Sequence, residues 1–383
     1  MMRPVAYATL ALVLTWTAAP AQADRIPTAG TEMTPLDQYV AAPDASYAWR
    51  LVSRRDDDEA TALVLDLGSQ TWRTDAEIDR PLWQHWLAIT IPKTAATDTG
   101  LLFIGGGNNG AAAPRGPSQR ARAVALATES VVAELGQTPN QPLVFRGDGR
   151  ARKEDDLVAR SWRESLQTGD PQWAAQFPMT KSAVRAMDAT QEAVREHGFP
   201  ELRKFVVSGG SKRGWTTWLT AAVDPRVVAI APAVIDMLNI QASMKNHYAA
   251  YGFWAPSLGS YQRQGLTLFI NSPLASVLFQ QIDPYAFRDD AQVHSERHGG
   301  PILHSRFVAV LLRRPAGREA AVLRAERRPL AAGDKRPRYA HRISRVGGAW
   351  PASTAGGLAA ERRRRLDRNE RAAPQPGASV AGE

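Results

Sequence analysis

The segment at residues 205–215, Phe-Val-Val-Ser-Gly-Gly-Ser-Lys-Arg-Gly-Trp, holds the residues best suited to catalysis in this sequence. Its apolar start predicts a buried strand, and the serine flanked by glycines predicts a sharp turn into a helix. Small neighbours let such a turn hold a serine in strained backbone, with its hydroxyl above the sheet. The next backbone N–H then points toward a developing oxyanion. We therefore identify Ser211 as a candidate nucleophile and the Lys212 N–H as a candidate oxyanion donor.

Ser211 is preferred over Ser208 because Gly209 stands two residues before it, where Ser208 has an apolar residue. The pattern departs from Gly-x-Ser-x-Gly, since Arg213 occupies the second glycine position and Gly214 follows it. Two other interpretations stay open on the residues alone. In the first, the turn is a glycine-rich connection without chemistry. In the second, it holds a phosphate at the helix N-terminus.

A second glycine-rich loop, at residues 105–110, follows the apolar run at 101–104. Hydrolases with such a serine turn take another oxyanion N–H from a loop of this kind, so Gly105, Gly106 and Gly107 are candidate donors. A plain turn is the competing interpretation. The spacing and the following acid of a dinucleotide-binding turn are missing, and we expect no cofactor and no metal.

The elements that must position these loops alternate between apolar strands and helical segments. Strands are expected at 61–73, 83–91, 101–104, 143–145, 205–207 and 227–234, and helices at 118–135, 180–196 and 212–222. This alternation favours an α/β fold, a mostly parallel sheet with helices on both faces. The aromatic segment 237–285 is interpreted as a cap-like excursion over the sheet. The charged runs at 56–59 and 152–156 are interpreted as a solvated loop and an exposed helix start.

A family resemblance covers residues 32–289. It is carried by residues 205–239 and 101–110, by Pro178-Met179-Thr180-Lys181 and by Asp283-Pro284-Tyr285, which closely resemble the PhoPQ-activated pathogenicity-related proteins. The resemblance implies an α/β-hydrolase fold, with Ser211 as the nucleophile toward an ester or amide. Bacterial members are linked to resistance to antimicrobial peptides, and a eukaryotic relative is a secreted growth repressor.

The acid and the histidine of a catalytic triad follow the serine in this architecture. Members of the family carry an Asn-Ala-Thr-Gly-Asp strand end and an Asn-Ala-Asp-His-Ser run, both expected after residue 290, and neither is found here. Asp236, after the next strand, and His247, in the excursion, are conceivable substitutes. A hydroxyl without its base is a poor nucleophile, so we expect this chain to be catalytically impaired and its sheet to be incomplete at the C-terminal strands.

The charge of the chain divides sharply. Residues 1–290 carry 28 basic and 30 acidic residues, whereas residues 291–383 carry 19 and 8, so the formal net charge of +9 comes from the last 93 residues. Codons can be chosen for Glu296–Leu303 that spell Asn-Ala-Thr-Gly-Asp-Gln-Phe one base later. In the same frame, codons for Glu326–Ala331 spell Asn-Ala-Asp-His-Ser. We hypothesise that residues 290–383 are an Arg-rich, out-of-frame, disordered tail. The alternative is a real basic tail, with Arg362–Arg365 binding nucleic acid or lipid headgroups.

The N-terminus has the pattern of a secretory signal peptide at residues 1–23. Arg3 precedes an apolar run, and Ala21-Gln22-Ala23 follows it as a cleavage site. A short membrane anchor is the alternative, but the run is short for a span and Pro20 breaks it. We expect an exported protein, periplasmic or secreted, with a hydrolase-like domain at 24–289 and no stable membrane anchor. The absence of cysteine is compatible with export of a domain that needs no disulfide.

The expected partner is a small-molecule or peptide substrate and not a nucleic acid, and the oligomeric state is left open. Two other functions remain. One is a secreted binding or signalling protein on a hydrolase fold, whose serine is vestigial. The other is a carbohydrate esterase, because glucuronoyl esterases show a similar Gly-x-Ser-Arg-x-Gly pattern. The aromatic residues at 248–261 would then form a sugar platform.

Overall fold

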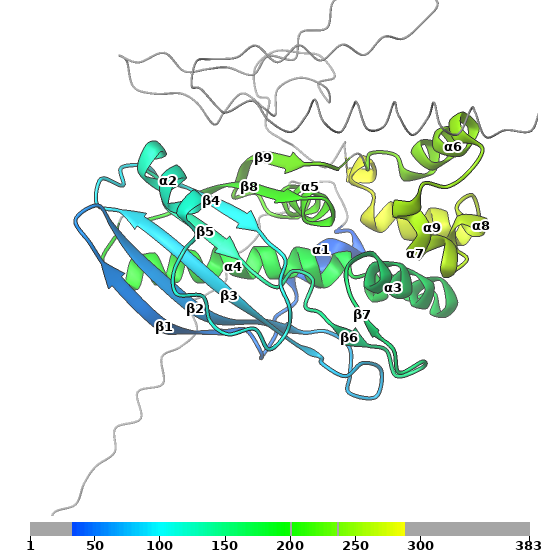
Figure 1. The fold of residues 1–383 in the computed structure, drawn as a ribbon, viewed down its shortest axis with the longest axis horizontal. Coiled ribbons are helices and arrows are strands. Elements are labelled where there is room, and N and C mark those ends of the chain that lie inside the picture. The colour runs from blue at the N-terminus through cyan, green and yellow to red at the C-terminus, as the bar shows by residue number, and fades with distance from the viewer. Residues whose placement is uncertain (1–32, 200, 236, 288–383) are drawn as a thin grey trace, which may run out of the picture. The chain divides into compact units, whose positions relative to one another are not determined.

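A seven-stranded mixed sheet is the centre of the computed structural model, which describes residues 33–287 except 200 and 236 (Figure 1). The strand order is β1-β2-β3-β5-β4-β8-β9. The strands are β1 (Ala48–Asp56), β2 (Ala60–Thr71), β3 (Leu82–Pro92), β4 (Thr99–Ile104), β5 (Val132–Leu135), β8 (Lys204–Gly210) and β9 (Val227–Ala233). The predicted signal peptide and the tail at 290–383 lie outside the described residues.

Half of the sheet is parallel. β5, β4, β8 and β9 run parallel to one another, while β1, β2, β3 and β5 pair antiparallel in turn. The connection from β2 to β3 spans only residues 72–81, and a parallel return needs a crossover that is usually a helix. Helices α2 (Gln119–Thr128) and α5 (Lys212–Val223) provide such crossovers between β4 and β5 and between β8 and β9. The fold is of the α/β-hydrolase type, as predicted, with its parallel part confined to these four strands.

Helices cover both faces of the sheet. Leu101 of β4 packs with Ala121 and Ala125 of α2 in a small apolar cluster. The alternate residues Leu102 and Ile104 point into the main core, beneath α5 and the long helix α4 (Gln176–Glu196). This double burial accounts for the unbroken apolar run at 101–104, because a strand covered on both faces needs apolar residues at every position.

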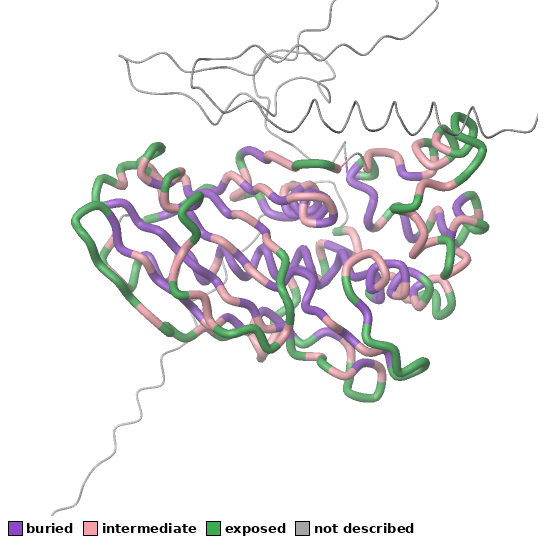
Figure 2. Tube along the Cα trace, in the orientation of Figure 1, coloured by how far each residue is buried: buried purple, intermediate pink, exposed green. Residues whose placement is uncertain are grey.

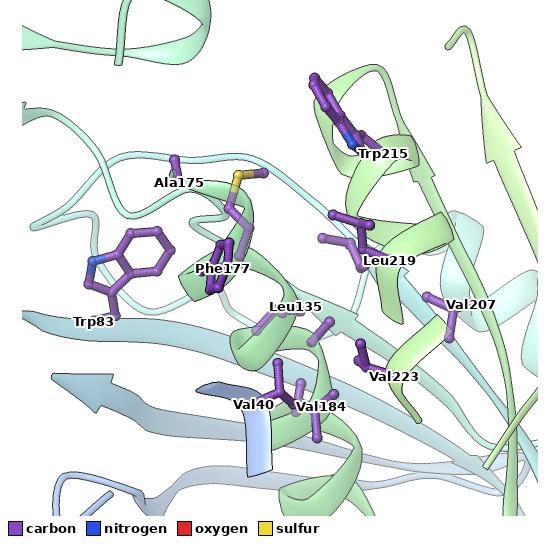
Figure 3. Packing of buried hydrophobic residues seen from close by; sticks show 14 of the residues in the cluster. Val40, Trp83, Leu135, Ala175, Phe177, Val184, Val207, Trp215, Leu219 and Val223 are labelled. Carbon is purple, nitrogen blue, oxygen red and sulfur yellow. The ribbon is translucent and has the colours of Figure 1, made fainter. Parts of the chain in front are cut away.

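The main core lies between the sheet and helices α4 and α5. Figure 3 shows Leu219 and Val223 of α5 close to Val207 of β8, with Val184 of α4 nearby, and all four side chains are buried. Burial is concentrated in the central strands and in α4 (Figure 2). Packing in this core holds β8 in place, and the serine turn begins where this strand ends.

Three expected elements need correction. The range 118–135, expected as one helix, contains α2 up to Thr128, a left-handed Glu129 (φ 51°) and then β5. A four-residue strand buried on both faces has no alternating pattern that would separate it from a helix. The range 143–145 is not in the main sheet: β6 (Leu143–Val144) pairs with β7 (Ala151–Arg152) in a ribbon of its own. In addition, α4 starts at Gln176, four residues before the predicted position.

The described part of residues 237–287 is helical and adds no strand to the sheet. It contains α6 (Ile240–Tyr251), α7 (Gly259–Arg263), α8 (Leu266–Phe269), α9 (Pro273–Ile282) and the short 3-10 turns η2 (Pro256–Leu258) and η3 (Pro284–Phe287). The Trp215 indole of α5 donates to the Ile282 carbonyl (2.6 Å), which attaches this excursion to the core. The carboxylate of Asp283 accepts the N–H groups of Asn239 and Ile240, so the ends of the excursion meet. None of the helices described in the structure is long and apolar enough to cross a membrane.

Candidate active site

Ser211 occupies the turn between β8 and α5, with φ 56° and ψ −126°. This backbone conformation is unfavourable for a residue that carries a Cβ atom, and it persists only where the surroundings impose it. Two hydrogen bonds hold the turn: the Ser211 N–H donates to the Ala233 carbonyl of β9 (2.9 Å), and the Trp215 N–H donates to the Ser211 carbonyl (3.0 Å). The predicted sharp, strained turn from strand to helix is therefore present at this serine.

Two glycines allow the helix to start this close to the strand. A Cβ atom on Gly209 would lie 2.6 Å from the Arg213 carbonyl oxygen, and one on Gly214 would lie 2.7 Å from the side chain of Ile235. Both contacts are far below van der Waals distance. The steric demand for glycine thus falls at 209 and 214, and residue 213 is free to carry a side chain. This explains the departure from the Gly-x-Ser-x-Gly pattern.

The glycine loop at 105–107 lies after β4, the strand adjacent to β8. The Gly105 N–H donates to the Leu135 carbonyl (2.7 Å), so this candidate donor already has a partner in the sheet. In the part of the chain that the structure describes, the N–H groups of Gly106 and Gly107 donate no hydrogen bond. Lys212 is the first residue of α5, and an N–H in the first turn of a helix has no partner within the helix. The N–H groups of Lys212, Gly106 and Gly107 thus have no backbone acceptor among the described residues.

A carboxylate pairs with both basic residues that follow the serine. Glu154, at the start of α3 (Glu154–Thr168), binds the Arg213 guanidinium through two bonds, Oε1–Nη2 of 2.6 Å and Oε2–Nη1 of 2.7 Å. Its Oε2 also accepts the buried Lys212 ammonium (2.7 Å). Burial alone would raise the pKa of Glu154, but the hydrogen bonds from Arg213, Lys212 and Gln141 outweigh it and lower that pKa to about 2.

The charged run at 152–156 is therefore more than the exposed helix start that was expected. Glu154 and Asp155 both lie against the Lys212 ammonium, the latter at 3.4 Å. Sequence reasoning missed this role because 58 residues separate Glu154 from Lys212, and no local rule links them. A usable indication was present: a basic pair on a helix start that must pack against a sheet needs carboxylates nearby, since burying an unpaired charge is costly.

The same network reaches the glycine loop. The Arg213 Nη2 atom would lie 2.8 Å from a Cβ atom on Gly106, so the guanidinium packs directly against that residue. Its Nε donates to the Thr138 carbonyl (2.5 Å). Gln141 donates both to Glu154 Oε1 (2.6 Å) and to the Gly107 carbonyl (3.2 Å). The serine turn, the glycine loop and the start of α3 are thus held by one set of polar contacts.

His247, one of the two conceivable substitutes, is not brought to the serine. No contact within the described residues joins His247 to Ser211. The His247 Nε2 accepts the Ala255 N–H (3.1 Å), and its ring stacks on Trp254. Asp236 lies outside the described residues, as do the four histidines beyond residue 287.

The other two described histidines also have structural contacts. The buried ring of His85 lies between the Ser69 hydroxyl and the Gly136 carbonyl, at 3.0 Å from each, and burial lowers its pKa to about 4. His197 lies at the end of α4 and contacts the Ala193 carbonyl. In residues 33–287 as described, no histidine pairs with Ser211. That part of the chain also holds no group of carboxylates and histidines suited to a metal ion.

The model of the family described as PhoPQ-activated pathogenicity-related protein matches residues 36–295 of this sequence. The chain belongs to this family. The match includes the serine turn, the glycine loop and Glu154. A curated relative of this family member, Autocrine proliferation repressor protein A from Dictyostelium discoideum, is 43% identical over 258 residues. The aligned region covers 67% of this chain and 52% of the relative, so the chain spans about half of that protein's length.

Solved structures similar to this chain include two esterases. An acetyl xylan esterase from a Thermoanaerobacterium species has 14% identity and a TM-score of 0.40, over 67% of this chain and 74% of that chain. A glucuronoyl esterase from Solibacter usitatus has 16% identity and a TM-score of 0.34, over 62% and 70%. At such scores these are likenesses only, and the fold class of the family member follows from its strand order and its serine turn.

Proposed function

We propose that the chain is a serine-hydrolase-like protein whose family chemistry is the cleavage of an ester or amide by Ser211. The observation that carries this proposal is the backbone of Ser211, held at φ 56° and ψ −126° at the junction of β8 and α5. A turn that only connects two elements has no reason to keep a non-glycine residue in this conformation. The family membership supports a hydrolase-like function in the coarser sense.

The proposed reaction is an acyl transfer. Ser211 Oγ attacks the carbonyl carbon, its proton passes to a base, and the carbonyl electron pair moves onto oxygen. The N–H groups of Lys212 and of Gly106 or Gly107 stabilise that oxyanion. The electron pair then returns, the alcohol or amine leaves with a proton, and water releases the acyl group by the same route. In the family the base is a histidine oriented by an acid, and both are expected beyond residue 290.

We further propose that this chain is catalytically impaired, because the family's acid and histidine runs are missing from its sequence. Losing the histidine of a triad costs several orders of magnitude in rate. The out-of-frame hypothesis for residues 290–383 gives the cause. Sequencing the gene across codons 285–295 tests it: a read with no base gained or lost, and no homologous product in the shifted frame, contradicts it.

Export to the periplasm or beyond belongs to the same proposal. Its support is the charged, apolar and small-residue pattern of residues 1–23. N-terminal sequencing of the mature protein is expected to begin after Ala23. An N-terminus that keeps the apolar run, in a protein recovered from the cytoplasm, contradicts export.

A carbohydrate ester is the second candidate substrate, favoured by an aromatic cluster on the excursion. Tyr248, Tyr251 and Phe253 are 49%, 63% and 60% exposed. The Tyr251 ring contacts those of His247 and Phe253, and the Tyr248 ring contacts that of Trp254. Exposed rings of this kind can stack on a sugar. No contact in the described residues links this cluster to Ser211, so it ranks behind the general ester or amide.

A substrate panel separates these possibilities. Simple esters, glucuronoyl esters and peptide amides are offered to the full chain and to a version with the reading frame restored, each with its Ser211→Ala variant. We expect turnover only in the restored protein, and loss of that turnover in Ser211→Ala. The matched control is Ser208→Ala, since the Ser208 hydroxyl donates to the Ala231 carbonyl and does not reach the turn. Turnover that survives Ser211→Ala, or none in any protein, contradicts the enzymatic proposal and favours a binding or signalling protein.

A further inference from the structure

We propose that Glu154 is a positioning residue of the serine site: through Arg213 and Lys212 it holds the serine turn and the glycine loop in register, so that their N–H donors converge. This inference rests on the proposed function. It assigns a role to a residue that does not itself touch the reacting atoms. Its support is the geometry of three elements that meet at one carboxylate.

Arg213 is the connecting part. It lies two residues after Ser211, and its planar guanidinium makes directed contacts on three sides. Two nitrogens bind Glu154, the third donates to the Thr138 carbonyl, and Nη2 packs against Gly106. A bidentate pair of this kind fixes direction as well as distance. The position of Gly106 relative to the serine turn is therefore set by how Glu154 holds the guanidinium.

Gln141 closes the arrangement from the other side. Its Oε1 accepts the Glu154 N–H (2.7 Å), while its Nε2 bridges Glu154 Oε1 and the Gly107 carbonyl. Glu154 itself has φ 52°, the left-handed region that glycine or asparagine occupies more easily. Gln141 thus holds both the backbone and the carboxylate of Glu154. The glycine loop is thus contacted twice by this network, at Gly106 and at Gly107.

Charge makes the carboxylate hard to replace. Lys212 and Arg213 are adjacent cations, one buried and one largely so, and both approach Glu154 Oε2 at 2.7 Å. Glu154 stays ionised throughout the ordinary pH range, since its pKa is about 2. With a neutral amide in its place, Asp155 at 3.4 Å from the Lys212 ammonium is the counter-charge that remains among the described residues. We expect the two cations to separate and the guanidinium to leave Gly106.

A boronic acid tests this without needing the catalytic histidine. When phenylboronic acid binds a serine, the hydroxyl oxygen bonds to boron, the hydroxyl proton goes to solvent, and boron becomes a tetrahedral anion that occupies the oxyanion site. Boron-11 NMR distinguishes this adduct from trigonal acid that is merely bound. The full 383-residue chain is titrated with phenylboronic acid. Glu154→Gln is compared with Asp156→Asn, a matched control in the same first turn that pairs with Arg150 and Arg152 instead.

We expect Glu154→Gln to weaken the tetrahedral adduct about tenfold, less than the loss of a whole oxyanion donor, with trigonal binding unchanged. Asp156→Asn should stay within about twofold of the parent. Arg213→Lys keeps the positive charge but loses the planar guanidinium that binds the carboxylate through two nitrogens, so it should weaken the adduct as Glu154→Gln does. If Glu154→Gln does not fold, Arg213→Lys provides the test in its place. An adduct as strong in Glu154→Gln as in Asp156→Asn, or an equal loss of both bound forms, overturns the positioning role. An adduct that persists in Ser211→Ala, or none in either the parent chain or the protein with the restored reading frame, overturns the proposed function instead.

Discussion

Arg213 and Glu154 stand 59 residues apart in the chain and form a bidentate ion pair, with nitrogen–oxygen distances of 2.6 and 2.7 Å, immediately behind the serine turn. The pair joins the start of α5 to the start of α3 and lies against the glycine loop. The strained backbone of Ser211 is therefore supported by more than the local turn.

Gly209→Ala should destabilise the fold. The added methyl group would lie 2.6 Å from the Arg213 carbonyl oxygen, so β8 and α5 must move apart. Overpacking of this kind costs about 1–3 kcal/mol. Urea denaturation followed by tryptophan fluorescence measures the change. Gly116→Ala is the control, because a Cβ atom there meets nothing within 4 Å, and a loss of the same size in both variants contradicts the steric explanation.

The ion pair of Glu154 should make stability fall in acid. Its pKa is lowered from an ordinary 4.5 to about 2 in the fold, so the unfolded chain binds the proton first. The stabilisation is complete above about pH 4.5 and is lost as the pH falls toward 2. Denaturation midpoints between pH 2 and 6 should show a shallower decline in Glu154→Gln than in the parent. Glu129→Gln, at an exposed glutamate, should leave the slope unchanged, and parallel profiles for all three proteins contradict the prediction.

His85 should cause a second loss of stability on acidification, at pH values above those at which Glu154 acts. Burial lowers its pKa from 6.5 to about 4, so between these values protons bind the unfolded chain but not the folded one. Stability is unaffected by His85 above about pH 6.5 and falls as the pH drops toward 4. His85→Gln should lower stability overall but flatten this part of the profile. A profile that keeps its slope between pH 4 and 6.5 in His85→Gln shows that other groups cause it.

Trp215→Phe should loosen the helical excursion. The indole N–H donates to the buried Ile282 carbonyl, and the phenyl ring leaves that carbonyl without a partner, at a cost of about 1–3 kcal/mol. Limited proteolysis should then cut within residues 237–287 faster than in the parent. Trp86→Phe is the control, since the Trp86 indole binds the Ala111 carbonyl in an exposed loop. Equal cutting rates in both variants contradict the role given to Trp215.

The sequence patterns correctly predicted those elements whose structure is determined by residues close together in the sequence. The serine turn needs an apolar strand, Gly209 and Gly214 within a few positions, and each is visible in the sequence. The strand β5 was missed because four residues are too few to show a periodic pattern. Glu154 was missed because its partners lie 58 and 59 residues away, and only the folded chain brings them together. Gly105 was expected to donate to an oxyanion, yet pairing with β5 occupies its N–H.

We propose that Ser211 is a nucleophile that this chain has lost the means to activate. Labelling with a fluorophosphonate probe, followed by mapping of the modified peptide, tests it most directly. We predict rapid labelling at Ser211 in the protein with the restored reading frame, labelling slower by several orders of magnitude in the 383-residue chain, and none at this site in Ser211→Ala. Equal labelling of the restored protein and its Ser211→Ala variant, or no labelling of either, contradicts the claim.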